Sequence, residues 1–146
     1  MLRRDMFRGL FASAGALFGL CQAHAATQQS PARQRVAYHL SDADKVAFVL
    51  GNIRNHYDGT GGNVEIVLVV HGPALAAFRT VGASAAVASR FAGLVKDGLA
   101  PQACANTMHG MDIGLADLLD GFVSAEQGGV VRLAELQREG YAYLRP

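Results

Sequence analysis

Asn63-Val64-Glu65-Ile66-Val67-Leu68-Val69-Val70 is the clearest strand in this chain of 146 residues. Its second half is apolar at every position, which is typical of a strand that other elements cover on both faces. His71-Gly72-Pro73 ends the strand, and Pro73 suits the first turn of a helix that continues to Arg79. A doubly covered strand that runs into a helix indicates a parallel sheet in an α/β domain.

Strands and helices alternate on both sides of this stretch. Before it we expect a strand at 35–40 and a helix with one buried face at helical spacing, formed by Val46, Val49, Leu50, Ile53 and Tyr57. After it we expect a helix capped by Ser84, a short strand at 101–104, a helix or turn from Asn106, an apolar helical patch over 113–119, a strand at 121–125, a helix at 130–139 and a strand at 141–144. The strand at 101–104 is weakly apolar, and the alternation of elements is the reason to expect it.

This alternation predicts an α/β domain with a mainly parallel five-stranded sheet and helices on both faces. In open parallel sheets, ligands and reactive groups gather beyond the carboxyl ends of the strands. Three loops would meet at that edge: His71-Gly72-Pro73, Cys104-Ala105-Asn106-Thr107 and Glu126-Gln127-Gly128-Gly129. We therefore expect the functional site among these loops.

The first 25 residues have the pattern of a secretory signal peptide. Three arginines, the last of them Arg8, precede an uncharged run at 9–21, and Ala23-His24-Ala25 supplies a small-x-small cleavage site. The apolar run is shorter than the roughly 20 residues of a membrane-spanning helix. The adjacent Arg3-Arg4 pair leaves the twin-arginine and the general export routes both open.

These features predict a signal peptide at 1–25, cleaved after Ala25, a flexible linker at 26–34 and one domain at 35–146. The mature protein is expected in the periplasm or outside the cell, with no membrane attachment. What remains after cleavage, about 120 residues, is long enough for one domain with a core and too short for two.

Removing the leader changes the charge and the cysteine content. Residues 1–25 hold three arginines and one aspartate, so the remaining chain has 10 basic and 11 acidic side chains and a net charge of −1. A nearly neutral chain without a basic run lacks the electrostatic pattern of a nucleic-acid-binding protein. Cys104 becomes the only cysteine, which excludes a disulfide within one mature subunit.

Cys104 is the strongest candidate for a chemical role. It is expected where a short strand meets a helix start, and there backbone N–H groups and the helix dipole favour the thiolate, the reactive form of the thiol. Cys104 would then act as a nucleophile or a sulfur carrier. From the residues alone, a buried thiol that only packs is the alternative.

The histidines offer a partner for this thiol. His71 is expected at the same edge of the sheet and would stabilise the thiolate or move a proton, unless it only turns the chain. His109 is close to Cys104 in sequence and has the same two interpretations. His39 and His56 are expected to be a strand-end residue and a helix-surface residue.

Asn106, Thr107 and Glu126 complete the candidate site. Asn106 and Thr107 are expected to cap the helix after Cys104, and all three are weaker candidates for substrate binding. Other site types lack a motif: there is no metal-ligand spacing, no G-x-S-x-G elbow, and no glycine-rich stretch that fits a P-loop or a dinucleotide fingerprint. We therefore expect no metal and no cofactor.

Three segments together resemble proteins of the DsrE/DsrF-like family. They are Ala103-Cys104-Ala105-Asn106-Thr107-Met108, the apolar strand that ends in His71-Gly72-Pro73, and residues 128–137 with Gly140-Tyr141-Ala142-Tyr143. The resemblance covers nearly the whole domain. It implies a flavodoxin-like three-layer α/β/α fold with a parallel five-stranded sheet, usually assembled into trimers or hexamers. It also implies that Cys104 corresponds to the cysteine on which the DsrE and TusD sulfur carriers hold a persulfide.

The resulting expectation is an exported homo-oligomer that carries sulfur on Cys104, as a sulfurtransferase-like component of a relay with a protein partner. His71 or the helix N-terminus would stabilise charge during the exchange. Two alternatives stay open. One is a non-catalytic small-ligand-binding or assembly module in which Cys104 only packs, and the other is a redox protein with intersubunit disulfides through Cys104.

Overall fold

Five parallel strands form one sheet in the order β4-β3-β2-β1-β5 in the computed structural model, which describes residues 32–146. The strands are β1 (Gln34–Leu40), β2 (Val64–Val70), β3 (Ala100–Cys104), β4 (Val123–Ala125) and β5 (Ala142–Leu144). The predicted parallel five-stranded sheet is confirmed, including the weakly apolar strand that ends at Cys104. The signal peptide predicted for residues 1–25 lies outside the described residues.

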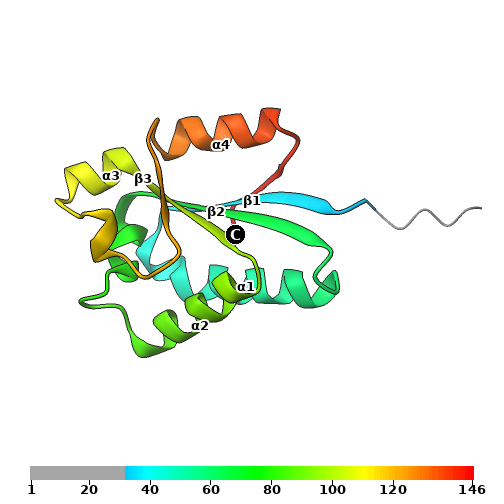
Figure 1. Cartoon of the computed structure of the whole chain (residues 1–146), viewed down its shortest axis with the longest axis horizontal. Coiled ribbons are helices and arrows are strands. Elements are labelled where there is room, and N and C mark those ends of the chain that lie inside the picture. Colours follow the sequence, from blue (N-terminus) through cyan, green and yellow to red (C-terminus); the bar gives the residue numbers. More distant parts are fainter. Residues whose placement is uncertain (1–31) are drawn as a thin grey trace, which may run out of the picture. The chain divides into compact units, whose positions relative to one another are not determined.

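Helices cover both faces of this sheet, with α1 (Val46–Gly59) and α2 (Ala85–Lys96) on one face and α4 (Gly129–Arg138) on the other (Figure 1). The short α3 (Ala105–Gly110) follows β3 directly, and three 3₁₀ helices complete the described chain: η1 (Ala43–Lys45), η2 (Gly72–Phe78) and η3 (Leu115–Asp117). The flavodoxin-like three-layer arrangement is therefore confirmed. None of the helices described in residues 32–146 is long and apolar enough to span a membrane.

Two cores fill the spaces between these layers. The larger core lies between the sheet and the α1–α2 layer, and all five residues predicted for the buried face of α1 belong to it. The smaller core lies under α4 and consists of Ala37, Val67, Val69, Leu133, Leu136 and Tyr141. Every residue of β2 except Glu65 is buried, because side chains of opposite parity enter opposite cores.

The apolar patch over 113–119 does not form the predicted helix. The chain there contains only η3, and Asp112 just before it has a φ of 51°, a left-handed conformation that interrupts a right-handed helix. Asp117 accepts a hydrogen bond from the N–H of Gly114 at 2.8 Å, which stabilises a tight turn at this place. Ile113 and Leu118 are still buried, so the apolar residues serve the core without helical spacing.

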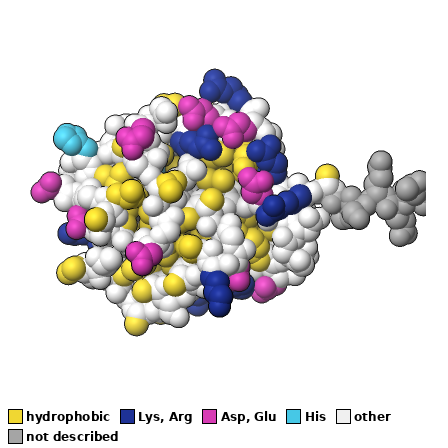
Figure 2. All heavy atoms as spheres, in the orientation of Figure 1, with side chains coloured by type: hydrophobic (Ala, Val, Ile, Leu, Met, Phe, Trp, Pro, Cys, Tyr) yellow, Lys and Arg dark blue, Asp and Glu magenta, His cyan; other side chains and the backbone are white. Residues whose placement is uncertain are grey.

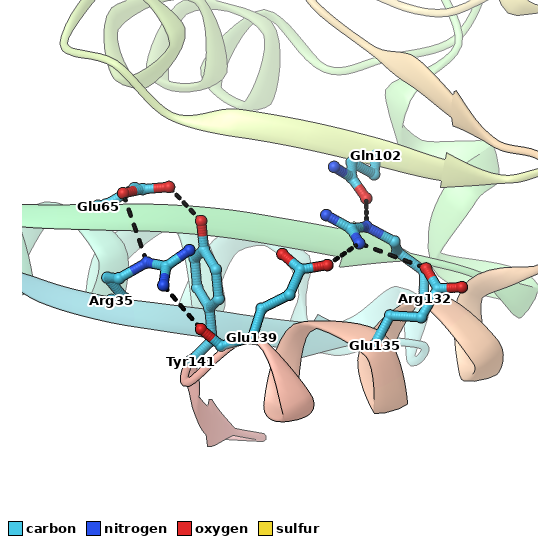
Figure 3. A network of polar contacts seen from close by, with 7 residues as sticks. All are labelled: Arg35, Glu65, Gln102, Arg132, Glu135, Glu139 and Tyr141. Carbon is cyan, nitrogen blue, oxygen red and sulfur yellow. Dashed lines mark hydrogen bonds and ion pairs between the residues drawn. The ribbon is translucent and has the colours of Figure 1, made fainter.

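Polar side chains connect α4 to the sheet on which it packs (Figure 3). Arg132 donates to Oε1 of Gln102 on β3 at 3.0 Å, to Glu135 on its own helix at 3.3 Å and to Glu139, the residue after that helix, at 2.9 Å. Arg35 of β1 donates to the backbone carbonyl of Glu139 at 2.7 Å. Because Gln102 precedes Cys104 by two residues on β3, Arg132 holds the helix over the strand that ends at the cysteine.

Candidate functional site

A cavity of about 270 Å³ opens at the carboxyl edge of the sheet, where β2, β3 and β4 end. His71, Cys104, Asn106 and Thr107 line it, together with the start of α4 from Gln127 to Val131. The three loops expected to converge from the strand order therefore share one cavity. Its volume lies just below the roughly 300–1,000 Å³ of sites for drug-sized molecules, which favours a small ligand.

Cys104 forms one wall of this cavity and is only 6% exposed. It is the last residue of β3 and the N-cap residue of α3, although no aligned side-chain hydrogen bond caps the helix. Burial raises the pKa of the thiol, but hydrogen bonding to the ionised sulfur from the Thr107 hydroxyl and from backbone N–H groups, with Gly129 first among them, outweighs it. The net pKa of Cys104 is lowered, which favours the reactive thiolate.

The Thr107 hydroxyl is oriented by the loop after β2. The backbone N–H of Gly72 donates to Oγ1 of Thr107 at 3.0 Å. A hydroxyl that accepts there retains its own hydrogen for a second partner, and Cys104 is the neighbour whose thiolate it stabilises. Gly72 has a φ of 59°, a left-handed conformation that glycine adopts without strain.

Two glycines bring the start of α4 close to Cys104. A Cβ atom on Gly129 would lie 3.3 Å from the Cβ atoms of both Cys104 and His71. A Cβ atom on Gly128 would lie 2.6 Å from Nδ2 of Asn106, and Gly128 has a φ of 94°. Glycine at these two positions therefore allows the start of α4 to lie close to Cys104 and Asn106.

His71 belongs to a row of polar side chains along the same edge of the sheet. Its Nε2 lies 2.5 Å from Nε2 of His39, and Nδ1 of His39 lies 2.7 Å from the hydroxyl of Tyr143. The three residues come from or follow the neighbouring strands β5, β1 and β2, and β3 with Cys104 is next in the order. Burial lowers the pKa of His71, so its imidazole is neutral at neutral pH.

Other sequence candidates lie away from the cavity. Glu126 is exposed and does not line it, because the turn from Ala125 to Gly128 directs Gln127 there instead. His109 is also exposed and is not among the lining residues. His39 and Tyr143 are the residues that the sequence interpretation missed, and only the adjacency of β5, β1 and β2 reveals them.

Among residues 32–146, no group of three or more His, Cys, Asp or Glu side chains is arranged to hold a metal ion. A larger hollow of about 550 Å³ lies near the end of α1, lined by Arg54, Tyr57, Asp58 and Asp97 among others. It is mostly open surface, and Arg54 is already paired with Asp97 at 2.6 Å.

Solved structures with the same fold include proteins from three organisms. The chain is similar to MTH1491, a protein of unknown function from Methanobacterium thermoautotrophicum, at 27% identity and a TM-score of 0.70, over 77% of this chain and 99% of that one. It is also similar to the ychN protein of E. coli, at 15% identity and a TM-score of 0.57, over 77% and 99% of the two chains. A third is BT1422 from Bacteroides thetaiotaomicron, a conserved protein of unknown function. It has 12% identity and a TM-score of 0.55, over 81% of this chain and 100% of that one.

These likenesses concern the fold. No protein-family model matches the chain, and no curated protein sequence matches it significantly. The similarity to MTH1491 and ychN supports a DsrE-like fold, whereas membership of the DsrE/DsrF-like family stays a prediction. The chain therefore has a DsrE-like α/β fold with a cysteine, a threonine and a histidine around one small cavity.

Proposed function

We propose that this protein carries sulfane sulfur as a persulfide on Cys104. The observation that supports this most strongly is the setting of the thiol, which faces a small cavity among donors that favour its ionised form. A thiolate is the form of cysteine that attacks sulfur. The family resemblance of the Cys104 segment points to the same chemistry.

The loading step is a displacement at sulfur. The Cys104 thiolate attacks the terminal sulfane sulfur of a polysulfide, and a new S–S bond forms at Sγ. The S–S bond within the donor breaks, and its electron pair leaves with the shortened polysulfide anion. No oxidant is consumed, because the sulfane sulfur is already at the required oxidation level. An acceptor thiolate then takes the outer sulfur and returns Cys104 to its thiolate form.

The surroundings of Cys104 match the charges in this exchange. Both the attacking thiolate and the persulfide product are anions, and the N–H groups of Asn106, Thr107 and Gly129 are the donors near them. His71 lines the same cavity, and in this proposal it takes up the thiol proton. The small volume favours a polysulfide or thiosulfate over a large organic donor.

Mass spectrometry of the intact protein and of its Cys104 peptide tests this function. After treatment with polysulfide, the wild type should gain the mass of one sulfur atom on that peptide, and dithiothreitol should remove it. The Cys104→Ser variant should gain none there. Absence of added sulfur on the wild type, or equal addition to the variant, would refute a carrier role for Cys104.

The low exposure of Cys104, 6%, supports a second candidate, in which the thiol only packs and the protein is a binding or assembly module. Alkylation by iodoacetamide separates the two. A carrier thiol should react in the native protein, and faster than a free cysteine near neutral pH. A packed thiol should react only after unfolding in urea.

Assembly and export are further parts of the proposal. Hydrophobic side chains gather in the middle of one face of the molecule, with charged side chains around its margin (Figure 2). Val130 and Val131, at the rim of the cavity, are 69% and 47% exposed, and such apolar surface is typical of a contact between subunits. To test assembly, light scattering should give the mass of a trimer or hexamer. To test export, N-terminal sequencing of the protein recovered from the periplasm should begin at Ala26.

A further inference from the structure

Tyr143, His39 and His71 form an unbroken line of titratable side chains that ends at the Cys104 cavity. The contacts are 2.7 Å from the Tyr143 hydroxyl to Nδ1 of His39 and 2.5 Å from Nε2 of His39 to Nε2 of His71. Tyr143 is 40% exposed, so the outer end of the line reaches solvent. His71 lines the cavity, so the inner end reaches the site proposed for sulfur transfer.

The two imidazoles meet edge to edge. Their ring centroids are 4.7 Å apart and their planes are inclined by 23°. This separation is close to the nitrogen–nitrogen distance plus the two ring radii, so both nitrogens lie nearly on the line between the centroids. A hydrogen on both of them would clash at 2.5 Å, and two bare lone pairs would repel each other. The neutral pair therefore shares one hydrogen at this contact.

One shared hydrogen couples the tautomers of the two rings. If Nε2 of His39 carries it, His71 must hold its own hydrogen on Nδ1, and Nδ1 of His39 accepts from the Tyr143 hydroxyl. If Nε2 of His71 carries it, Nδ1 of His71 is a bare lone pair, and Nδ1 of His39 donates to Tyr143. Nδ1 of His71 has no hydrogen-bond partner among residues 32–146, and His71 lines the cavity. The ring therefore offers a free donor at Nδ1 in one state and a free acceptor in the other.

We infer that Tyr143, His39 and His71 act as one proton relay between solvent and the Cys104 cavity, an inference that rests on the proposed function of Cys104. His71 exchanges the proton with the thiol. His39 and Tyr143 touch no substrate and are positioning residues, which set whether His71 offers a hydrogen or a lone pair to the cavity.

Each transfer in the relay breaks one bond to hydrogen and forms one. The Cys104 S–H bond breaks as Nδ1 of His71 gains a hydrogen. Nε2 of His71 passes its hydrogen to Nε2 of His39, and Nδ1 of His39 passes its hydrogen to the Tyr143 oxygen. The original Tyr143 hydroxyl hydrogen goes to water, so one proton has moved from the thiol to solvent. Both rings are left in the donor state that suits a thiolate or persulfide anion.

Burial is the main reason that both rings are neutral near neutral pH. Burial, with smaller contributions from the charges of His71 and Arg145, lowers the pKa of His39 to about 4, and Asp42 opposes these effects. Burial and Arg145 lower the pKa of His71 as well, again against Asp42. Arg145 is itself held by Asp42 at 3.4 Å and by the Ser41 hydroxyl at 3.0 Å.

Long-range ¹H–¹⁵N spectra of the full chain with labelled histidines test the relay, because ring nitrogens with and without hydrogen give different ¹⁵N shifts. The spectra are recorded through the ionisation of Cys104, whose midpoint comes independently from the pH dependence of iodoacetamide alkylation. The signals of His71 and also of His39 should move with that midpoint. In Cys104→Ser this movement should be lost.

Two matched variants separate a relay from a purely structural contact. Tyr143→Phe should shift the signals of both His39 and His71. Tyr38→Phe removes the equivalent hydroxyl from an unrelated pair, in which Tyr38 lies 3.0 Å from Nδ1 of His56, and it should shift His56 alone. A response of His39 to Tyr143→Phe that leaves His71 unchanged would overturn the relay.

The relay and the sulfur-carrier function fail in different experiments. If both histidines follow the ionisation of Cys104 and polysulfide adds no sulfur, the relay holds and the carrier function is refuted. If Cys104 takes up sulfur while His39 does not respond to the thiol, the carrier function holds and the relay is overturned.

Discussion

The backbone N–H of Gly72 donates to the hydroxyl of Thr107 at 3.0 Å, so the loop after β2 sets the direction of a hydroxyl on α3. Hydrogen bonding from that hydroxyl opposes the effect of burial and contributes to the lowered pKa of Cys104. The ends of three strands thus form the surroundings of one thiol. His71-Gly72 follows β2, Cys104 ends β3, and the start of α4 follows β4.

Thr107→Val should make Cys104 less reactive. The variant removes the donor to the thiolate, so the pKa of the thiol rises and alkylation slows several-fold at a pH below its ionisation. It also leaves the N–H of Gly72 unpaired, at a cost of about 1–2 kcal/mol in the free energy of unfolding. Alkylation kinetics and urea unfolding measure the two effects. Thr107→Ser keeps the hydroxyl and should restore most of the reactivity; equal rates for the two variants would contradict this account.

Gly129→Ala should push α4 away from the sulfur. Alanine is favoured over glycine inside helices by about 1 kcal/mol, but its methyl group would meet Cys104 and His71 at 3.3 Å. We expect a net loss of about 1 kcal/mol in stability and slower alkylation of Cys104, because overpacking outweighs helix propensity. Gly51→Ala in α1 is the control, since nothing lies within 4 Å of its added methyl group. Stabilisation of both variants would show that the close approach at Gly129 does not matter.

Acid should destabilise the folded protein through His39. Burial, with smaller contributions from the charges of His71 and Arg145, lowers the pKa of His39 from 6.5 to about 4. Between these values the unfolded chain binds a proton that the folded chain does not. The free energy of unfolding therefore falls as the pH falls through that window. We expect a loss of about 1 kcal/mol, well below the full linkage value, because solvent screens the partly exposed ring.

Urea unfolding at pH 6.5 and at pH 4 measures this loss. His39→Gln removes the titrating group and should reduce the difference between the two conditions. His109→Gln, which changes an exposed histidine outside the cavity, should leave the difference as it is in the wild type. An unchanged difference in His39→Gln would assign the acid sensitivity to other groups.

Arg132→Gln should loosen α4 without changing the residues that line the cavity. Arg132 is 22% exposed and pairs with Gln102, Glu135 and Glu139, so its removal leaves partly buried polar groups with fewer partners (Figure 3). We expect the free energy of unfolding to fall by about 1–2 kcal/mol and amide hydrogen exchange in α4 to become faster. Arg138→Gln, at an exposed position of the same helix, should cost less than about 0.5 kcal/mol.

The sheet was predictable because its signals are local. The uninterrupted apolar run of β2 and the helical spacing of α1 each follow from side-chain alternation within a few residues, and both are confirmed. The patch over 113–119 has similar apolar content, yet the left-handed conformation of Asp112 stops a helix there. Such a turn depends on tertiary packing, which the local pattern does not encode.

The candidate site was predictable in part for the same reason. The strand–helix alternation places Cys104 and His71 at one edge of the sheet, and they do share a cavity. His39 and Tyr143 were missed because their contact depends on β1 lying between β2 and β5, an order that hydrophobic periodicity does not determine. The sequence suggested Glu126, but the neighbouring Gln127 lines the cavity instead. A turn decides which of these two adjacent polar side chains faces the cavity.

The donors that favour the ionised sulfur of Cys104 belong to two separate helices, since Asn106 and Thr107 are in α3 and Gly129 begins α4. An anion at this position therefore links two parts of the chain that the sequence joins only through β4 and a long loop. Protonation of the sulfur removes the negative charge that both helices face. The protonation state of one thiol thereby affects how firmly the start of α4 is held against α3.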